Sequence, residues 1–388
     1  MIVPHSEATG FEEKTTGARD ISYAVEFRSG KSEVCGSGTP RFTLVVTDES
    51  QLRGILEGDS HSAAMAFIRG QFDVSGDLIA ALRLKDRLHR TGFLDWFWTL
   101  AAGLAPARIE TWIQSRTRAA RNIRFHYDLS NAFYRQFLDS RLVYSDACFR
   151  DPHWSLEQAQ EAKLDGICRD LDLRPDQRFL DIGCGWGALL IHAAERYRAR
   201  ATGCTLSHNQ YEFANSSIQA RGLAGEVRVL EMDYREIGQP FDKIASIGMF
   251  EHVGRHRLGE YFHKIYRILE PGGRFLNSGI CRPQGVGADP QTWFLLRNVF
   301  PGGELAHLSD VIREAERAGF CILDIRSVRE DYARTCREWV ARLRKSGNDC
   351  IRLVGERTYR TWLLYLAASA FSFESRQTEA FSLLMSKS

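Results

Sequence analysis

The sequence predicts an α/β protein in which a doubly wound, Rossmann-like sheet follows a small α+β N-terminal domain. Apolar strand-like runs alternate with helical patterns between residues 178 and 278, as expected for a parallel sheet. With 388 residues and 44% apolar side chains, the chain is long enough for a large core and a second domain. The central stretch is RFLDIGCGWGA, residues 178–188, because it has the pattern of a buried strand, a tight turn and a helix start.

The turn in this stretch indicates a nucleoside site. Its glycines stand at alternate positions, Gly183, Gly185 and Gly187. Because glycine has no Cβ atom, a ligand can lie against the backbone there. The spacing GxGxG differs from the GxGxxG of dinucleotide-binding folds, and no GK[ST] follows, so a phosphate-binding loop is disfavoured.

Further strands are predicted at 201–206, 226–233, 241–248 and 274–278. Ser207 is the expected cap of the helix after the second strand, and a helix through Tyr261 should close at Pro271. Ligands of such sheets bind at the carboxyl ends of the strands. The sequence therefore predicts one site from the residues at these ends: Asp181, Gly183, Thr205, Gln210, Asp233 and Glu251.

Motifs in a fixed order identify a family. Through the predicted sheet they are LDIGCGWG (180–187), GCTLSHNQ (203–210), FDKIASIGMFEHVG (241–254) and ILEPGGRF (268–275). Outside it they are the stretch 125–149, VFPGGEL (299–305), REDYARTCREWVARL (329–343) and LLYLAASAFSFES (363–375). Together they resemble the cyclopropane-fatty-acyl-phospholipid synthase family of class I S-adenosylmethionine-dependent methyltransferases, over residues 120–388 and more weakly over 42–85. The resemblance implies a class I methyltransferase sheet whose inserted and C-terminal helices form an acyl pocket.

The resemblance implies S-adenosylmethionine as the cofactor. Tyr144 and Ser145 would close over its methionyl end, and Asp181 would help to set the glycine loop. Beyond the loop, the expected contacts are Thr205, Leu206 and Gln210 at the ribose, and Asp233 with Tyr234 at the adenine. Asp233 has an alternative interpretation as an acid that caps the next segment.

The family holds a bicarbonate with a cysteine, a glutamate, a histidine and a tyrosine. Here Glu251 and Tyr332 match the glutamate and the tyrosine. Asp146 and Asn277 stand where the family has the cysteine and the histidine, and Gly279 stands where an isoleucine is expected. A carboxylate at 146 near Glu251 would repel an anion, so bicarbonate binding is doubtful.

We hypothesise that Asp146 or Glu251 itself accepts the proton and stabilises the cation formed on the substrate. In the alternative, Asp146 turns outward and Cys148 faces the site. Two carboxyl groups that lie close together also raise the pKa of one of them.

The resemblance implies transfer of a methyl or methylene group to the double bond of an unsaturated acyl chain, in phospholipid at a membrane surface. The product, a cyclopropane or a methyl-branched or furan-precursor chain, stays open. Two alternatives remain: a small-molecule N-methyltransferase of the coclaurine type, using Glu251 with His252 or His256, and a cofactor- or lipid-binding protein that has lost its chemistry.

The C-terminal third is expected to supply the acyl pocket. The run 362–371 is apolar on nearly all sides, as in a helix that is buried or lines a cavity. Phe294, Phe300 and Phe371 are the predicted substrate contacts. A helix should begin at Leu308, with Ser309 as its cap.

Four segments are predicted. Residues 1–30 are polar and expected to be mobile, and 31–90 form a small α+β domain with a layout like sterol-carrier folds. In it we expect a strand at 42–46, a helix starting near Asp48 and another at 63–72. Residues 91–124 are an aromatic and basic linker, suited either to anionic lipid or to a contact between domains. Residues 125–388 are the methyltransferase domain.

Composition limits the partners. The net charge of +2 gives no drive toward nucleic acid. The nine cysteines include no CxxC pair, so neither disulfides nor a metal site is predicted. The start of the chain has no signal-peptide pattern, and no apolar run is long enough to span a bilayer. We expect a cytoplasmic protein peripherally associated with the inner face of the membrane; a homodimer is left open.

Overall fold

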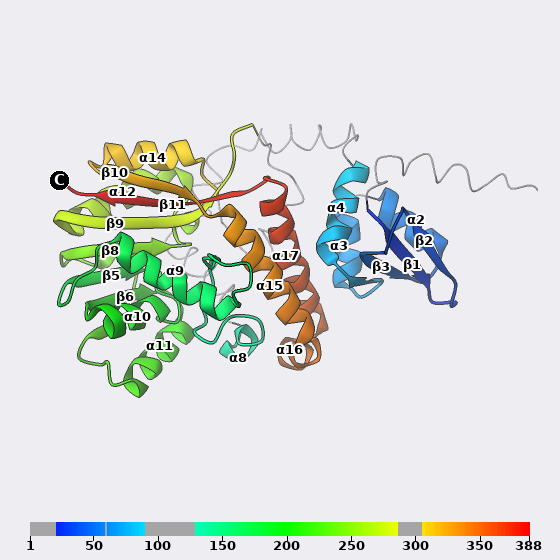
Figure 1. Ribbon diagram of the computed structural model, residues 1–388, viewed down its shortest axis with the longest axis horizontal. Helices are drawn as coiled ribbons and strands as arrows, with labels where there is room; N and C mark the ends of the chain where they lie inside the picture. The colour runs from blue at the N-terminus through cyan, green and yellow to red at the C-terminus, as the bar shows by residue number, and fades with distance from the viewer. Residues whose placement is uncertain (1–20, 59, 90–128, 286–304) are drawn as a thin grey trace, which may run out of the picture.

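The computed structural model describes residues 21–58, 60–89, 129–285 and 305–388. A small sheet with its helices lies at one end and a large sheet with its helices at the other (Figure 1). The C-terminal helices α15 (Arg329–Lys345), α16 (Gly347–Val354) and α17 (Glu356–Glu374) stand between them.

The small sheet has four strands in the order β2-β1-β3-β4. They are β1 (Tyr23–Phe27), β2 (Ser32–Cys35), β3 (Phe42–Val46) and β4 (Asp73–Gly76), and the helices beside them are α2 (Glu49–Glu57), α3 (Ser60–Ile68) and α4 (Leu78–His89). Two expectations are wrong here. The domain does not begin at residue 31, since β1 is an inner strand of the sheet, and the helix expected at 63–72 ends at Ile68, ahead of Gly70 in its left-handed conformation.

The large sheet has seven strands in the order β10-β11-β9-β8-β5-β6-β7. They are β5 (Arg178–Ile182), β6 (Arg200–Thr205), β7 (Val227–Glu231), β8 (Phe241–Ile247), β9 (Leu269–Cys281), β10 (Cys321–Ser327) and β11 (Glu379–Ser386). Strands β5 to β9 are parallel, and β11 runs antiparallel to β9 and β10. The doubly wound α/β prediction is confirmed.

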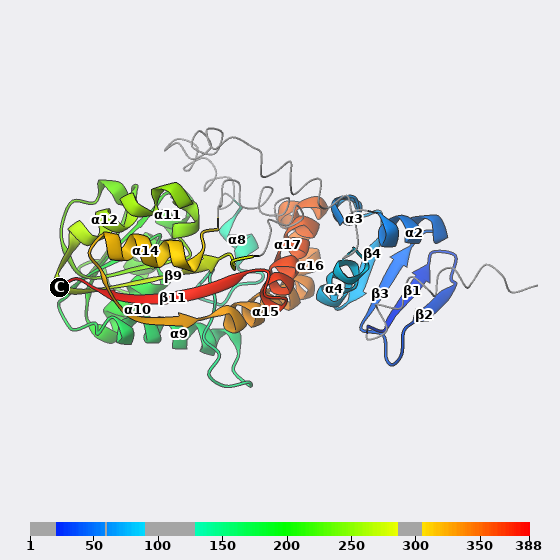
Figure 2. The same cartoon turned by 90° about the horizontal axis from the view of Figure 1, so that it is seen from above.

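Helices cover both faces of this sheet. On one face α12 (Leu258–Ile268) and α14 (Leu308–Arg317) bury Tyr261, Ile265 and Val311. On the other, α9 (Leu156–Asp170), α10 (Ala188–Tyr197) and α11 (His208–Ala220) bury Leu164, Leu190 and Ile218. Figure 2 shows α12 and α14 above the sheet, with α9 and α10 below it. Short helices α8 (Asn131–Tyr134), η2 (Tyr234–Glu236), η3 (Phe250–His252) and η4 (Arg255–Arg257) complete this part.

Two local expectations can be judged at helix starts. Ser207 caps α11, because its side chain accepts a hydrogen bond from the backbone N–H of Gln210, as predicted. Ser309 does not cap α14: the cap is His307, and its side chain makes no capping bond. The last parallel strand also starts earlier than expected, at Leu269, because Gly272 and Gly273 pair with Lys387 beyond β11.

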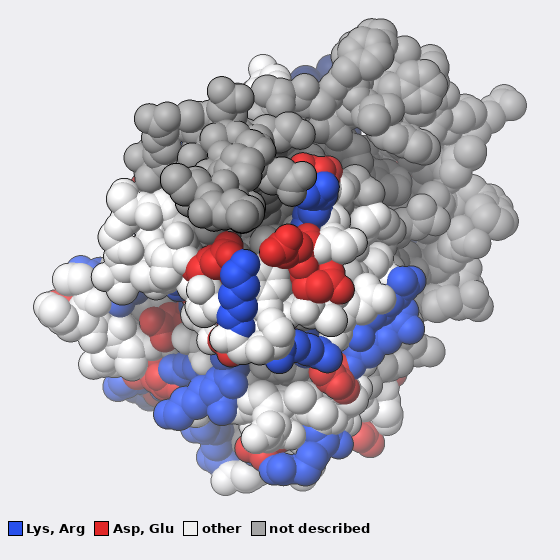
Figure 3. Space-filling view, turned by 90° about the vertical axis from the view of Figure 1, so that its right-hand side faces the viewer, with Lys and Arg blue, Asp and Glu red and all other residues white. Residues whose placement is uncertain are grey.

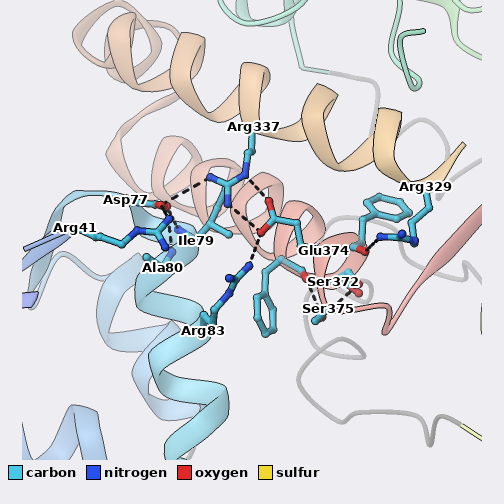
Figure 4. Close-up of polar contacts among 12 residues, drawn as sticks. Arg41, Asp77, Ile79, Ala80, Arg83, Arg329, Arg337, Ser372, Glu374 and Ser375 are labelled. Atoms are coloured by element: carbon cyan, nitrogen blue, oxygen red, sulfur yellow. Dashed lines mark hydrogen bonds and ion pairs between the residues drawn. The ribbon is translucent and has the colours of Figure 1, made fainter. Parts of the chain in front are cut away.

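An ion cluster joins the small unit to the C-terminal helices (Figure 4). The carboxylate of Glu374 on α17 accepts from Arg83 of α4 at 2.7 Å and from Arg337 of α15 at 2.9 Å. Arg337 also lies 3.8 Å from Asp77, which binds Arg41 at 2.6 Å and accepts from backbone N–H groups in the first turn of α4. The two units are thus held together by charge as well as by a shared apolar cluster.

Replacing Arg337 with Met should reduce the free energy of unfolding by about 1–2 kcal/mol, because Glu374, which is 17% exposed, then keeps Arg83 alone as a charged donor among the described residues. Urea denaturation would measure the loss. The matched control is Arg352→Met: Arg352 is 73% exposed and pairs with Asp349 within α16, so its loss should stay below about 0.5 kcal/mol. Equal losses in the two variants would contradict the assignment.

Candidate active site

A cavity of about 190 Å³ opens at the carboxyl ends of the parallel strands. The segments that follow β5, β6, β7 and β8 line it, as the topology of a doubly wound sheet requires. All predicted cofactor contacts except Gly187 lie on its wall: Tyr144, Ser145, Asp181, Gly183, Gly185, Thr205, Leu206, Gln210, Asp233 and Tyr234. Their individual contacts with a cofactor stay predictions.

The glycine loop faces this cavity. Gly183 and Gly185 both have positive φ, 77° and 53°, which favours glycine. A Cβ atom at Gly185 would meet no atom within 4 Å, so the backbone there borders open space. Gly187 is different and corrects the prediction, because its Cβ position lies 3.1 Å from Ala214 of α11, so it allows helix packing and does not line the cavity.

The predicted ribose and adenine contacts already bind one another or their neighbours. The hydroxyl of Thr205 donates to Gln210 Oε1 at 2.7 Å, which leaves the Gln210 amide nitrogen as its donor for a ligand. Asp233 caps η2 and accepts from Arg235 Nε at 2.8 Å. These contacts match the alternative interpretation, in which this acid caps the next segment. A carboxylate has further acceptor positions, and Asp233 still lines the cavity.

Sequence reasoning missed several residues of the cavity wall, notably Lys163, Trp186, Met249 and Arg257. Trp186 lies inside the glycine loop, and its indole N–H donates to Asn131 of α8 at 2.8 Å. Lys163 was detectable in principle, because it occupies a position on the apolar face of α9.

Two buried carboxyl groups lie near one another outside the cavity wall. Asp146 is 6% exposed and Glu251 is 7% exposed. Burial raises the pKa of Asp146 to about 6 and that of Glu251 to about 7, and the charge of Asp146 adds to the rise at Glu251. The alternative in which Asp146 turns outward is therefore wrong.

Tyr332 completes this buried group. It lies on α15 with 9% of its surface exposed, and its ring stacks on Phe373 of α17 at 4.6 Å between centroids. Burial, with contributions from Asp146 and Glu251, raises the pKa of Tyr332, so the phenol stays protonated. A neutral phenol near two acids is a possible hydrogen-bond donor to a bound group.

Glu251 is fixed by one oxygen and open at the other. Its Oε1 accepts from the backbone N–H of Ile280 at 2.7 Å, while Oε2 is buried without a hydrogen-bond partner among the described residues. This approach depends on Gly279, since a Cβ atom there would lie 2.4 Å from Phe250 and 2.7 Å from Glu251 Oε1. Gly279 thus makes room for the glutamate on β9.

Gly279→Ala should lower kcat for methyl transfer by about tenfold or more, because the new methyl group displaces Glu251 from Ile280. Steady-state kinetics with the cofactor saturating would measure it. Gly225→Ala is the control, since no atom lies within 4 Å of its Cβ position. An unchanged kcat in Gly279→Ala would mean that the position of Glu251 does not matter.

Comparison with known proteins assigns the family. A family model described as mycolic acid cyclopropane synthetase matches residues 114–383. The chain belongs to this family. It is 37% identical over 344 residues to a "Probable fatty acid methyltransferase" of Pseudomonas putida, covering 87% of this chain and 84% of that protein. It is 34% identical over 269 residues to "Cyclopropane mycolic acid synthase 3" of Mycobacterium tuberculosis, covering 66% and 94%.

Solved structures agree. The mycolic acid cyclopropane synthase CmaA1 complexed with SAH and CTAB matches with a TM-score of 0.67 and 31% identity, over 69% of this chain and 98% of that chain. MmaA2 from Mycobacterium tuberculosis matches with the same TM-score, identity and coverage. Members of the cyclopropane synthetase family with this sheet are class I methyltransferases, so the protein is an S-adenosylmethionine-dependent methyltransferase, as predicted.

For this synthetase family member, the coclaurine-type alternative has weak support. A coclaurine N-methyltransferase matches at 22% identity with a TM-score of 0.57, which shows the shared fold alone. His256 is exposed on η4, while Glu251 is buried. His252 lines the cavity, and burial lowers its pKa to about 4, so it is neutral at physiological pH.

Asn277 lies on β9, and its side-chain oxygen bonds to helix α12. Its Oδ1 accepts from the hydroxyl of Tyr261 at 2.8 Å, on the face of the sheet that α12 covers. Its Nδ2 is buried without a partner in the described part of the chain. Asn277 is thus bonded to the core beside the site, and its catalytic role stays a prediction.

Of the three predicted substrate contacts, Phe371 lies among the described residues. Phe371 on α17 is half-buried and packs on the apolar cluster that α15, α17 and α8 share. Phe294 and Phe300 lie outside the described residues, as do residues 91–124. Helix α17 is buried along most of its length, at residues such as Leu363, Leu366 and Ala370.

Proposed function

We propose that the protein transfers a methyl group from S-adenosylmethionine to the double bond of an unsaturated fatty acyl chain, in phospholipid. The observation that carries this proposal is the buried pair Asp146 and Glu251, with Tyr332 beside them, next to the cofactor cavity. An alkene has no proton to lose before it reacts, so its enzyme needs a base for the step that follows the transfer.

The cofactor fits the cavity, because glycine backbone borders open space there and the walls carry both carboxyl and amide groups. When bound, S-adenosylmethionine supplies a methyl carbon made electrophilic by its sulfonium. The residues of the cavity hold the two reactants in line and exclude water. The π electrons of the alkene form the new carbon–carbon bond as the carbon–sulfur bond breaks, with its electrons left on sulfur, and the chain carbon next to the new bond becomes cationic.

A carboxylate then removes a proton from the cationic chain. Loss from the transferred methyl group closes a cyclopropane ring, and loss from the chain gives a methyl-branched alkene. We assign this step to Asp146 or Glu251, whose pKa values of about 6 and 7 suit a base near neutral pH. In this proposal the carboxylates replace the family's bicarbonate.

The test is lipid mass spectrometry on cells that produce the protein and are fed methionine with a fully deuterated methyl group. A phospholipid acyl chain that keeps two deuterons and has lost its double bond is a cyclopropane. A chain that keeps all three is methyl-branched. Label found in a soluble amine and in no lipid would overturn the proposal.

The choice between carboxylate and bicarbonate has its own test. With purified enzyme and vesicles of unsaturated phospholipid, the rate should not depend on added bicarbonate, and Asp146→Ala should lower it. A rate that requires bicarbonate and is unaffected in Asp146→Ala would sink the carboxylate assignment.

We further propose that the enzyme works at a membrane surface, on the cytoplasmic side, because the acyl chains of phospholipids lie in a bilayer. None of the described helices combines the length and hydropathy needed to cross a bilayer. The described part of the outer face of the small unit carries Lys and Arg interspersed with Asp and Glu (Figure 3). Flotation with anionic vesicles tests the association, and sedimentation tests the homodimer.

A further inference from the structure

Helix α9 carries a lysine on its buried face. Lys163 is 8% exposed and shares that face with Leu156, Gln160 and Ile167. It also lines the cofactor cavity. Because lysine is rarely buried unless its ammonium is paired, the groups around it indicate its role.

The contacts of α9 hold the residue before Asp146. Lys163 Nζ donates to the hydroxyl of Ser145 at 2.8 Å, and Gln160 Nε2 donates to the Ser145 carbonyl at 2.9 Å. On the other side of Asp146, the backbone N–H of Ala147 donates to Thr335 of α15 at 2.8 Å. Asp146 is therefore held between the helix that carries Lys163 and the helix that carries Tyr332.

Acidic groups face the ammonium from two sides. Asp139, Asp146 and Cys148 come from the loop before α9, and Asp181 comes from β5. Burial lowers the pKa of Lys163, and these acids oppose that effect. Burial raises the pKa of Asp181 to about 7, and Lys163 opposes the rise.

Asp146 faces further acidic groups from other elements. Asp331, Tyr332 and Cys336 come from α15, and Glu251 comes from η3. Among the described groups that face Asp146, Lys163 is the one that carries a positive charge. It therefore borders the cofactor cavity on one side and the buried acids on the other.

We propose that Lys163 is a positioning residue for methyl transfer: its ammonium fixes Ser145 and favours the ionised forms of Asp146 on the acyl side and Asp181 on the cofactor side. The Asp146 part rests on the proposed function, whereas the Asp181 part rests on cofactor binding alone. Without the ammonium, both carboxyl groups ionise only at higher pH.

Three variants separate charge from hydrogen bonding. Lys163→Gln keeps a donor for Ser145 but removes the charge, Lys163→Arg keeps the charge, and Ser145→Ala removes the bond but leaves the charge. We expect the acid limb of the kcat profile to move to higher pH by about 0.5–1 unit in Lys163→Gln, and to stay in place in the other two. A purely structural role would lower kcat evenly across pH.

The experiment uses the full chain, vesicles of dioleoyl phosphatidylglycerol and S-adenosylmethionine labelled in its methyl group. Calorimetric titration with S-adenosylhomocysteine near pH 6 and pH 8 is run beside it. The affinity at pH 8 divided by the affinity at pH 6 should be larger in Lys163→Gln than in Lys163→Arg. Without the ammonium, Asp181 is more fully protonated at pH 6, so cofactor binding is weakened more at that pH.

An acid limb that stays in place in Lys163→Gln overturns the Asp146 part, and equal affinity ratios overturn the Asp181 part. If the wild-type protein labels no lipid, the proposed function fails, and the affinity ratios alone decide for or against Lys163. If Lys163→Gln does not fold, an acid limb displaced in Lys163→Arg, although the charge is retained, overturns the proposal.

Discussion

Replacing Glu251 with Gln should lower kcat for methyl transfer by about 100- to 10,000-fold, which is the usual range for removing a general base. The amide keeps an oxygen that can accept from Ile280 N–H, so the side chain should stay in place. What it loses is the ability to take up a proton at Oε2, the buried oxygen that has no hydrogen-bond partner among the described residues. The affinity for S-adenosylhomocysteine should change little, because Glu251 is not on the cavity wall.

Single-turnover assays with labelled cofactor would measure this loss. Glu226→Gln is the matched control, because Glu226 is exposed ahead of β7 and should leave kcat unchanged. A Glu251→Gln enzyme with wild-type kcat would move the base to Asp146. Loss of cofactor binding in parallel with kcat would mean that the variant disturbs the cavity and does not test the base.

The cofactor side of the site was predictable because it is local. A strand, a glycine turn and a helix follow one another within residues 178–188, and residues other than glycine rarely adopt the positive φ found at Gly183 and Gly185. Strand ends of a parallel sheet meet at one edge whatever their spacing in the sequence, so Thr205 and Asp233 could be placed there as well.

The acid side depends on contacts between distant parts of the chain. Asp146 is held through its neighbours: Ser145 bonds to α9, and Ala147 bonds to Thr335 of α15, 188 positions later. Lys163 lies on the apolar face of α9, but the acidic groups that its ammonium faces come from other parts of the chain. For Asn277, the family motif gave only the position, and its hydrogen bond to Tyr261 of α12 depends on the tertiary fold.

The predicted start of the N-terminal unit was wrong for a similar reason. Tyr23–Phe27 (YAVEF) is a short apolar run that follows a mostly polar stretch, and it pairs with β2 and, in parallel, with β3. Such a strand is stabilised by partners outside its own segment, and composition alone does not reveal them.

The second large effect concerns stability and pH. Burial raises the pKa of Glu251 to about 7 from a usual value near 4.5, so the folded protein keeps this proton over a range in which the unfolded chain has lost it. When the folded state binds more protons, stability falls as pH rises. This contribution is therefore largest below about pH 4.5, declines between the two pKa values, and levels off above about pH 7.

Gln does not ionise, so the stability of the Glu251→Gln variant should not decline with pH through this group. We expect the variant to gain about 2–3 kcal/mol of unfolding free energy relative to wild type between about pH 4.5 and pH 8, since each unit of pKa shift corresponds to about 1.4 kcal/mol. Urea denaturation of both proteins at the two pH values gives the difference, and any effect of the amide that is independent of pH cancels. A difference that does not change with pH would mean that Glu251 ionises as readily in the fold as in water. Its burial would then not prepare it as the base, and the loss of kcat in the same variant would need another cause.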